Sequence, residues 1–390
     1  MLANSAFLVV FPWLVLSYTG NASLSSAVIA LVMIPTAVVT LAAGRLIDRV
    51  GRKKASIIAG LGCTFAGAAL WAAEGAGSLS VPMLIVLGVG AQLFVSPSTT
   101  ARDALMDDIA EASGISVERL AGMRQVTFSV AYAIGPALAG LLLGTSTSFL
   151  VVGMIAVAWA IAVVLTMMLP GGSREPLVRA NSPKDRVSLS GLLRSNRSVR
   201  AAPIIGFGTA IISAPITSVL LPAHFTELGQ PQLYGVVVSA FAVGALVGSL
   251  TYAGLAKRAG ASVYVAAVIV TSIGIAGFAF LPTFWMLAVA LLVGGIGSGL
   301  LAPMLLVAVT KGTTREERGR ALGAYNAASL GAGPIGLGLL GLLLHISPDL
   351  HAGTFAVLAV WVVVGVYALG RVRAITVPEV PQAVPETERG

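Results

Sequence analysis

Charged side chains gather in the stretch Gly44–Lys54, which reads GRLIDRVGRKK. Asp48 and Arg52 lie four residues apart, a spacing at which opposite charges pair on one helix face if the turn stays helical. Gly51 lies between them and favours a tight turn, because glycine adopts backbone conformations that other residues avoid. This stretch, which includes Arg49, predicts either an ion-pair cluster at a helix end or a solvated basic loop.

Other residues that carry chemistry are scarce. The lone Cys63 excludes an internal disulfide and a cysteine-based metal site, and three histidines are too few and too scattered for a metal cluster. We find no nucleophile, acid–base pair or metal site of an enzyme, and we expect no cofactor. Glu227 with His224 is the best remaining pair of titrating groups, and ordinary surface residues are the alternative.

Some polar and aromatic residues stand inside long apolar runs, where each either lines a substrate cavity or has a purely structural role. The polar ones would otherwise bond a neighbouring helix, and the aromatic ones would otherwise face lipid. These candidates are Phe11, Trp13, Gln92, Ser96, Gln125, Tyr132, Ser213, Tyr325 and Asn326. The runs themselves hold no acid or base at depth, where a charge costs at least ~2.5–3.5 kcal/mol and usually marks function.

The elements that carry these residues are membrane spans. Hydrophobic residues make up 57% of the chain and charged residues 10%, whereas a soluble domain has about 25% charged residues. A bilayer-spanning helix needs about 20 apolar residues. We therefore predict an all-α integral membrane protein with spans at 3–20, 24–43, 55–74, 81–101, 121–143, 149–169, 202–223, 233–252, 262–281, 284–309, 321–344 and 353–370.

All 24 lysines and arginines fall on one side of these spans. They lie in the loops after even-numbered spans and in the C-terminal tail, and the loop after span 4 is taken to hold Arg102 and Arg124. By the positive-inside rule, these segments and both termini are cytoplasmic. The net charge of +8 is thus a topology signal that also suits anionic lipid headgroups, not nucleic acid.

The spans form two related groups of six. GRLIDRVG after span 2 matches AGLAKRAG after span 8, and both fifth spans carry Gly-Pro. Parallel repeats related by an axis along the membrane normal are one known transporter plan. We predict an N-terminal bundle at 1–170, a cytoplasmic linker at 171–200, a C-terminal bundle at 201–373 and a disordered tail at 374–390.

The stretch Gly44–Lys54 resembles the cytoplasmic signature of the major facilitator superfamily, G-x-L-x-D-R-x-G-R-K-x, and matches every fixed position. The resemblance implies two six-helix bundles that rock during transport. It also implies that Asp48 faces the start of the eleventh span and that Asp103 or Asp107 takes the arginine. Such a cluster would latch the cytoplasmic side shut, whereas the alternative is a loop that only sets topology.

A second resemblance lies in the fifth span, where Gly122, Gly135, Pro136 and Gly140 fit the motif of the superfamily's antiporter branches, with alanine at two glycine positions. Two further stretches, Phe7–Gly20 and Ser96–Gly140, are similar to a bacterial drug and siderophore exporter branch. The resemblance implies export, while small residues on one helix face are also generic membrane packing.

Together these patterns predict a monomeric secondary active exporter of a small amphipathic or hydrophobic solute in the bacterial inner membrane. Its partners would be the solute, the bilayer and, as candidate coupling ion, protons. The alternatives are an uptake permease for a neutral solute and a non-transporting sensor. Span 1 follows Met1 at once, without the basic leader that relatives carry, so we expect further residues upstream. The alternative is that the later cations alone set the orientation.

Overall fold

The computed structural model describes residues 1–169, 196–255, 260–280 and 283–377. The described residues include 12 helices long and apolar enough to cross a membrane, which confirms the predicted all-α fold and its span count. The side chains at Gly44, Asp48, Arg49 and Asp107 lie outside the described residues, as do residues 171–195 of the predicted linker at 171–200 and residues 378–390 of the predicted tail.

The first six spans form the N half, with one short helix, α5, at the surface. Its helices are α1 (Leu2–Thr19), α2 (Ala22–Val50), α3 (Arg52–Gly75), α4 (Val81–Ala104), α5 (Met106–Ser113), α6 (Val117–Thr145) and α7 (Ser148–Met168).

The last six spans form the C half, whose first span changes helix type along its length. The helices are α9 (Arg197–Pro215), the π-helix η1 (Ile216–Leu220), α10 (Leu221–Glu227), α11 (Pro231–Leu255), α12 (Ala261–Ala279), α13 (Phe284–Lys311), α14 (Arg315–Ile346), α15 (Leu350–Leu369) and α16 (Val372–Thr376).

Two spans extend well beyond their predicted ends at the charged side. The second span was expected to end at 43, but α2 continues to Val50 and ends at Gly51, whose φ of 91° lies in the region that favours glycine. The eleventh span was expected to begin at 321, but α14 begins at Arg315. Thr314 and Glu317 form a capping box there, which satisfies backbone N–H groups that would otherwise be unpaired.

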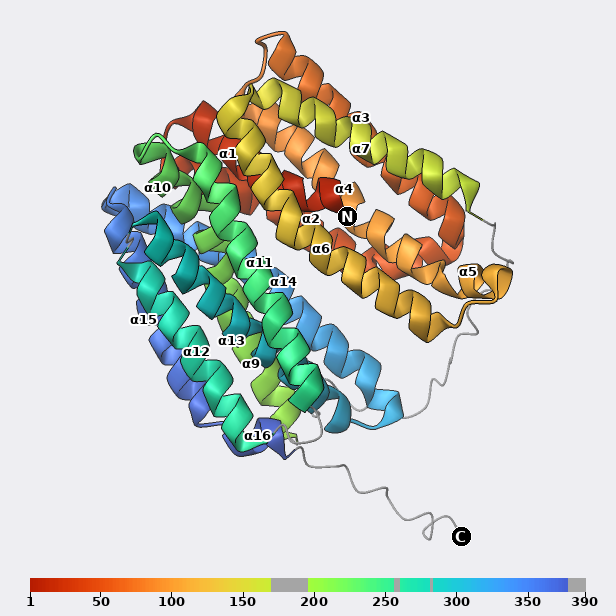
Figure 1. Ribbon diagram of the computed structural model, residues 1–390, viewed down its shortest axis with the longest axis vertical. Helices are drawn as coiled ribbons and strands as arrows, with labels where there is room; N and C mark the ends of the chain where they lie inside the picture. Colours follow the sequence, from red (N-terminus) through yellow and green to blue (C-terminus); the bar gives the residue numbers. More distant parts are fainter. Residues whose placement is uncertain (170–195, 256–259, 281–282, 378–390) are drawn as a thin grey trace.

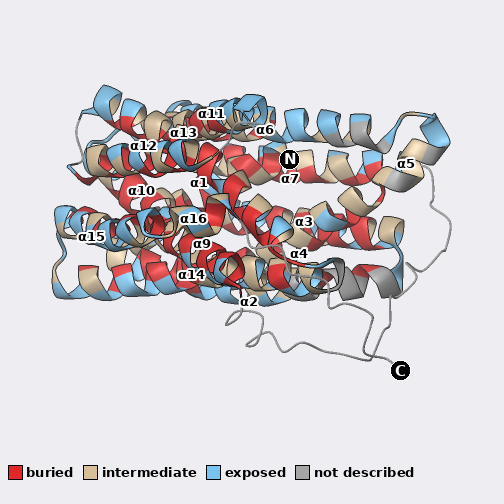
Figure 2. Ribbon diagram, turned by 90° about the horizontal axis from the view of Figure 1, so that it is seen from below, coloured by how far each residue is buried: buried red, intermediate tan, exposed pale blue. Residues whose placement is uncertain are grey.

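The two ends of the bundle differ in charge. We call the end that carries the α2–α3 turn at Gly51, α5 and the α13–α14 turn the basic end, and the opposite end, with the turns at Gly20 and Gly229, the far end. Buried residues lie between the helices and exposed ones on their outward faces (Figure 2). Many of those outward side chains are large and apolar, as a lipid-facing surface requires.

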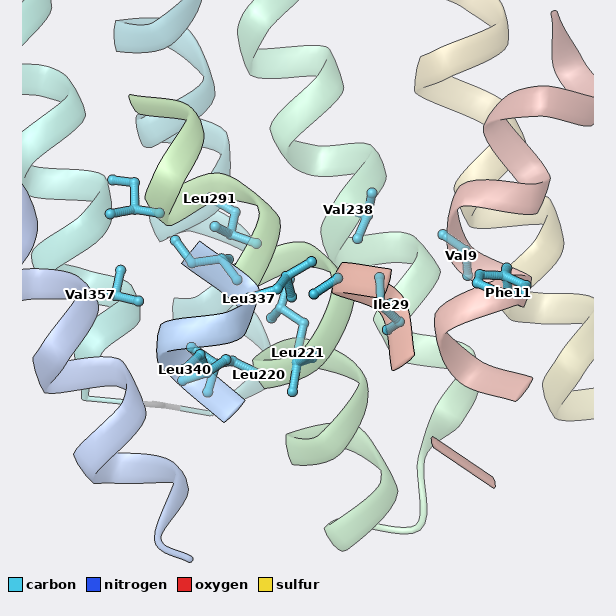
Figure 3. Packing of buried hydrophobic residues seen from close by; sticks show 14 of the residues in the cluster. Val9, Phe11, Ile29, Leu220, Leu221, Val238, Leu291, Leu337, Leu340 and Val357 are labelled. Atoms are coloured by element: carbon cyan, nitrogen blue, oxygen red, sulfur yellow. The ribbon is translucent and has the colours of Figure 1, made fainter. Parts of the chain in front are cut away.

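The main apolar core runs through both halves, and a small separate cluster of Ala43, Ile47, Ala55 and Ala101 lies in the N half. Ile29 of α2 lies between Val9 of the N half and Leu337 and Leu221 of the C half (Figure 3). Elsewhere each half packs chiefly on itself, α3 against α4 and α7, and α13 against α11 and α12. The halves are therefore two bundles joined mainly through the helix pairs α2–α14 and α6–α11.

Candidate functional site

Helices α2 and α14 form one side of the junction between the halves, at the far end. The Ser26 hydroxyl donates to the carbonyl oxygen of Leu337 at 2.6 Å, and the Ser23 hydroxyl to that of Gly341 at 2.7 Å. Gly333 of α14 lies against Met33, whose terminal carbon would be 2.8 Å from an added Cβ. Hydroxyl donors and a missing side chain thus let two helix backbones approach closely, as in many membrane helix pairs.

Helices α6 and α11 form the other side of the junction, also at the far end. Gly140 and Gly235 face each other so closely that a Cβ on either would lie 2.8 Å from the Cα of the other. The Ala137 N–H donates to the Ser239 hydroxyl at 2.8 Å. Ala139, one of the two alanines in the predicted fifth-span motif, is 1% exposed.

The predicted fifth-span motif thus serves two contacts. Gly135 packs inside the N half, where an added Cβ would lie 2.0 Å from the Ser5 hydroxyl oxygen. That hydroxyl also donates to the carbonyl oxygen of Ala131 at 2.7 Å, which ties α1 to α6. Pro136 lies within α6 and Gly140 contacts the C half, whereas an added Cβ at Gly122 would meet nothing within 4 Å.

The halves separate towards the basic end. In α6, six of the seven residues from 122 to 128 are exposed, and seven residues cover about two turns, so this part of the helix is exposed all round. Gly254 of α11 and Gly319 and Gly323 of α14 also have open space where a Cβ would stand. Figure 1 shows α6 and α11 diverging from their far-end contact. A space open at the basic end therefore lies between the halves.

Charge pairs line the basic end of the N half. Arg52 of α3 pairs with Asp108 of α5 at 3.5 Å, and Arg124 of α6 forms a two-pronged ion pair with Asp103 of α4. Helix α2 ends at Gly51 and α3 begins at Arg52, while the Asp48 side chain lies outside the described residues, so the Asp48–Arg52 pair stays a prediction. The resemblance named Asp103 or Asp107 as the partner of the arginine. Asp103 pairs with Arg124, and the Asp107 side chain lies outside the described residues, so this partner stays a prediction.

The predicted cavity residues do not form one cluster. Phe11 is buried inside the N half, stacked on Phe7 with ring centroids 5.3 Å apart and touching Gly88. Tyr132 stacks on Phe128 of the same helix, with ring centroids 4.3 Å apart. The remaining candidates divide by exposure: Gln125, Ser213 and Asn326 are exposed, and Trp13, Gln92, Ser96 and Tyr325 are half-buried.

Arg102 was predicted to lie in a loop, but it lies in the last turn of α4. Helix α4 continues to Ala104, and the Arg102 guanidinium turns back into the bundle to donate to the carbonyl oxygen of Ser98 at 3.1 Å and to its hydroxyl at 2.8 Å. The Arg102 side chain lines a small cavity inside the N half. Trp159 of α7 lines this cavity too, and its indole N–H donates to the side-chain oxygen of Asn4 at 2.7 Å. The sequence holds one sign of this arrangement, a serine four residues before the arginine, which is the spacing of neighbours on one helix face.

The predicted titrating pair lies at the far end. Glu227 is exposed and lines a cavity of about 260 Å³ that both halves enclose, with Leu16 and Ser23 on one side and Leu344 on the other. His224 is half-buried one turn earlier in α10. Among the hydrogen bonds of the described residues, none joins the two side chains. The far-end surface therefore carries a carboxylate where the halves meet.

Two six-helix membrane bundles related as a repeat are one known plan of membrane transporters. The family model of the Major Facilitator Superfamily matches residues 1–229 and 204–389. The chain belongs to this superfamily, as its two motifs predicted.

Relatives and solved structures agree with this assignment. The multidrug efflux pump Tap of Mycobacterium tuberculosis (strain ATCC 25618 / H37Rv) is 32% identical over 371 residues, 91% of this chain and 86% of that protein. Tap of Mycolicibacterium fortuitum is 29% identical over 97% of this chain and 95% of its own length. The xylose transporter XylE from E. coli, in an inward open conformation, superposes with a TM-score of 0.72 at 13% identity, covering 98% of this chain and 95% of its own.

Proposed function

We propose that this transporter exports a small amphipathic or hydrophobic solute by alternating access. The observation that carries the proposal is the asymmetry of the junction: the halves pack tightly at the far end and stand apart at the basic end. A rocking motion that opens the far end and closes the basic end would expose a solute between the halves to the other side. In this proposal, the solute loads from the basic end in the state with the far end closed.

The substrate class follows from the lining and from the relatives. Three of the predicted cavity residues, Gln125, Ser213 and Asn326, are exposed, polar and uncharged. Such walls suit a solute that offers apolar surface and a few hydrogen-bonding groups. The related Tap proteins are named multidrug efflux pumps, which favours export of drug-like compounds over uptake of a neutral nutrient.

The orientation and the energy source belong to the same proposal. The one-sided cations put the basic end and both termini in the cytoplasm of the bacterial cell. Loading from the basic end then means export. An ion gradient would drive the cycle, with Glu227 and His224 at the far end as the candidate proton-binding pair. The turn at Gly51 would contact the start of α14 and latch the basic end after rocking.

Everted membrane vesicles test the proposal, because their interior corresponds to the outside of the cell. Vesicles that contain the transporter should accumulate a hydrophobic fluorescent dye when a pH gradient is imposed, and a protonophore should abolish the accumulation. Vesicles with the Asp48→Asn variant at equal abundance are the matched control. Accumulation no higher than in vesicles without the transporter, over a panel of neutral and cationic dyes, would refute export.

A further inference from the structure

A second hollow lies within the C half, away from the space between the halves. It is a cavity of about 70 Å³ enclosed by α9, η1, α11, α12, α13 and α15. Its floor is apolar and buried, formed chiefly by Ile275 and Phe278 of α12, Leu291 of α13 and Trp361 of α15, each less than 9% exposed. None of its lining residues is ionisable.

The rim of this C-half pocket is different from its floor. The more accessible lining residues are Thr209, Ser213, Thr217, Phe241 and Ser298, four of which carry hydroxyl groups. The hydroxyls of Thr209, Ser213 and Thr217 each donate to a backbone carbonyl of α9, and each hydroxyl oxygen can still accept a hydrogen bond from a ligand. The pocket thus has a hydroxyl rim and a dry floor.

The π-helix η1 shapes this pocket. Pro222 has no N–H to donate to the carbonyl oxygen of Ser218, so regular α-helical bonding fails there, and η1 follows Pro215 directly. The Tyr234 hydroxyl donates to the carbonyl oxygen of Thr217 at 2.5 Å and fixes the widened turn. Such π-helical turns often stand at functional sites. Because η1 also contacts α1 and α2, the rim lies at the junction of the halves.

We infer that the C-half pocket binds one uncharged ring of the transported solute, while the rest of the solute stays in the space between the halves. This rests on the proposed function and adds the class of group that is recognised. A cavity of about 70 Å³ is large enough for several water molecules but too small for a whole drug-sized molecule. Dry apolar cavities bind benzene-like rings, and the absence of a lining charge disfavours a cation.

Benzophenone is a suitable probe, because it is neutral, carries two rings and one carbonyl acceptor, and inserts into nearby C–H bonds under ultraviolet light. Purified transporter in lipid nanodiscs is irradiated with increasing benzophenone, and the modified residues are mapped by peptide mass spectrometry. We expect saturable labelling of Ile275 and Leu291, which are buried from lipid. Side chains on the lipid-facing surface should be labelled in proportion to concentration.

Two substitutions that fill the pocket give the decisive comparison. Ser298→Phe places a ring at the rim and should lower the saturable labelling about tenfold or more. Gly294→Ala adds one methyl group to the lining with no backbone atom nearer than 3.5 Å, so it preserves the fold and should lower labelling severalfold. Gly338→Ala on the exposed face of α14 is the matched control and should change nothing.

Labelling of Ile275 and Leu291 that does not saturate, or that Gly294→Ala leaves unchanged, would overturn the inference. The outcome is separable from the proposed function. Dye export in vesicles without saturable labelling would refute the ring pocket alone, whereas saturable labelling in a chain that exports none of the dye panel would refute export alone.

Discussion

Adding one methyl group at Gly235 should disfavour the state seen here. A Cβ at this position would lie 2.0 Å from the carbonyl oxygen of Pro136 and 2.8 Å from the Cα of Gly140, and neither backbone atom can rotate away. Since Cβ contacts below 3.0 Å essentially never occur, α6 and α11 must part by about 1 Å. Overpacking of this kind costs ~1–3 kcal/mol, which corresponds to an equilibrium shift of about 5- to 150-fold.

The shift can be read from a buried reporter at the far end. Ile29→Cys, 4% exposed in the native chain, is placed in a Cys63→Ser background that removes the single native cysteine. A water-soluble maleimide reacts with it only when the far end opens, so Gly235→Ala should raise the labelling rate about fivefold or more. Gly338→Ala is the control. Equal rates for the two variants would refute the claim that Gly235 holds the far end closed.

Further perturbations address the other contacts. Asp48→Asn should slow dye export strongly at unchanged membrane abundance. Undiminished export would show that the charged stretch around Gly51 only sets the topology and does not act as a latch. Ser26→Ala removes one junction hydrogen bond worth about 0.6 kcal/mol, so Ile29→Cys labelling should rise about threefold. A double-mutant cycle of Asp103→Ala and Arg124→Ala should give a coupling of ~0.2–1 kcal/mol in thermal unfolding, because both side chains are about one-third exposed. Glu227→Gln should abolish the dependence of export on the pH gradient, and an unaltered dependence would exclude Glu227 as the proton site.

The spans were predictable because the bilayer imposes a simple requirement on each one. About 20 apolar residues must occur together, and one-sided cations fix the count. All twelve predicted spans are confirmed. The largest displacements of their ends are at α2, which continues to Val50, and at α14, which begins at Arg315. The family followed from local motifs, since the Gly44–Lys54 stretch keeps every fixed position of its signature.

The details of the site depend on interactions that no local pattern encodes. Arg52 pairs with Asp108 because α5 lies beside the start of α3, a placement that no local sequence pattern predicts. The direction of the Arg102 side chain depends on a hydroxyl one turn away and on the space inside the N half. Pro215 and Pro222 mark an irregular seventh span, but the pocket beside it requires four further helices to be in place. Which end is closed depends on a small free-energy difference between two packings.

Alternating access is tested most directly by measuring both ends of the same helix pair. Nitroxide labels at Gln125 and Leu255 report the basic ends of α6 and α11, and labels at Thr145 and Gln230 report their far ends; all four residues are exposed. Electron–electron double resonance is recorded in nanodiscs, in the Cys63→Ser background, with and without an exported dye and at two pH values. The distance at the basic end should shorten in the same conditions in which the distance at the far end lengthens. Distances that stay fixed in every condition, or that lengthen together, would contradict alternating access.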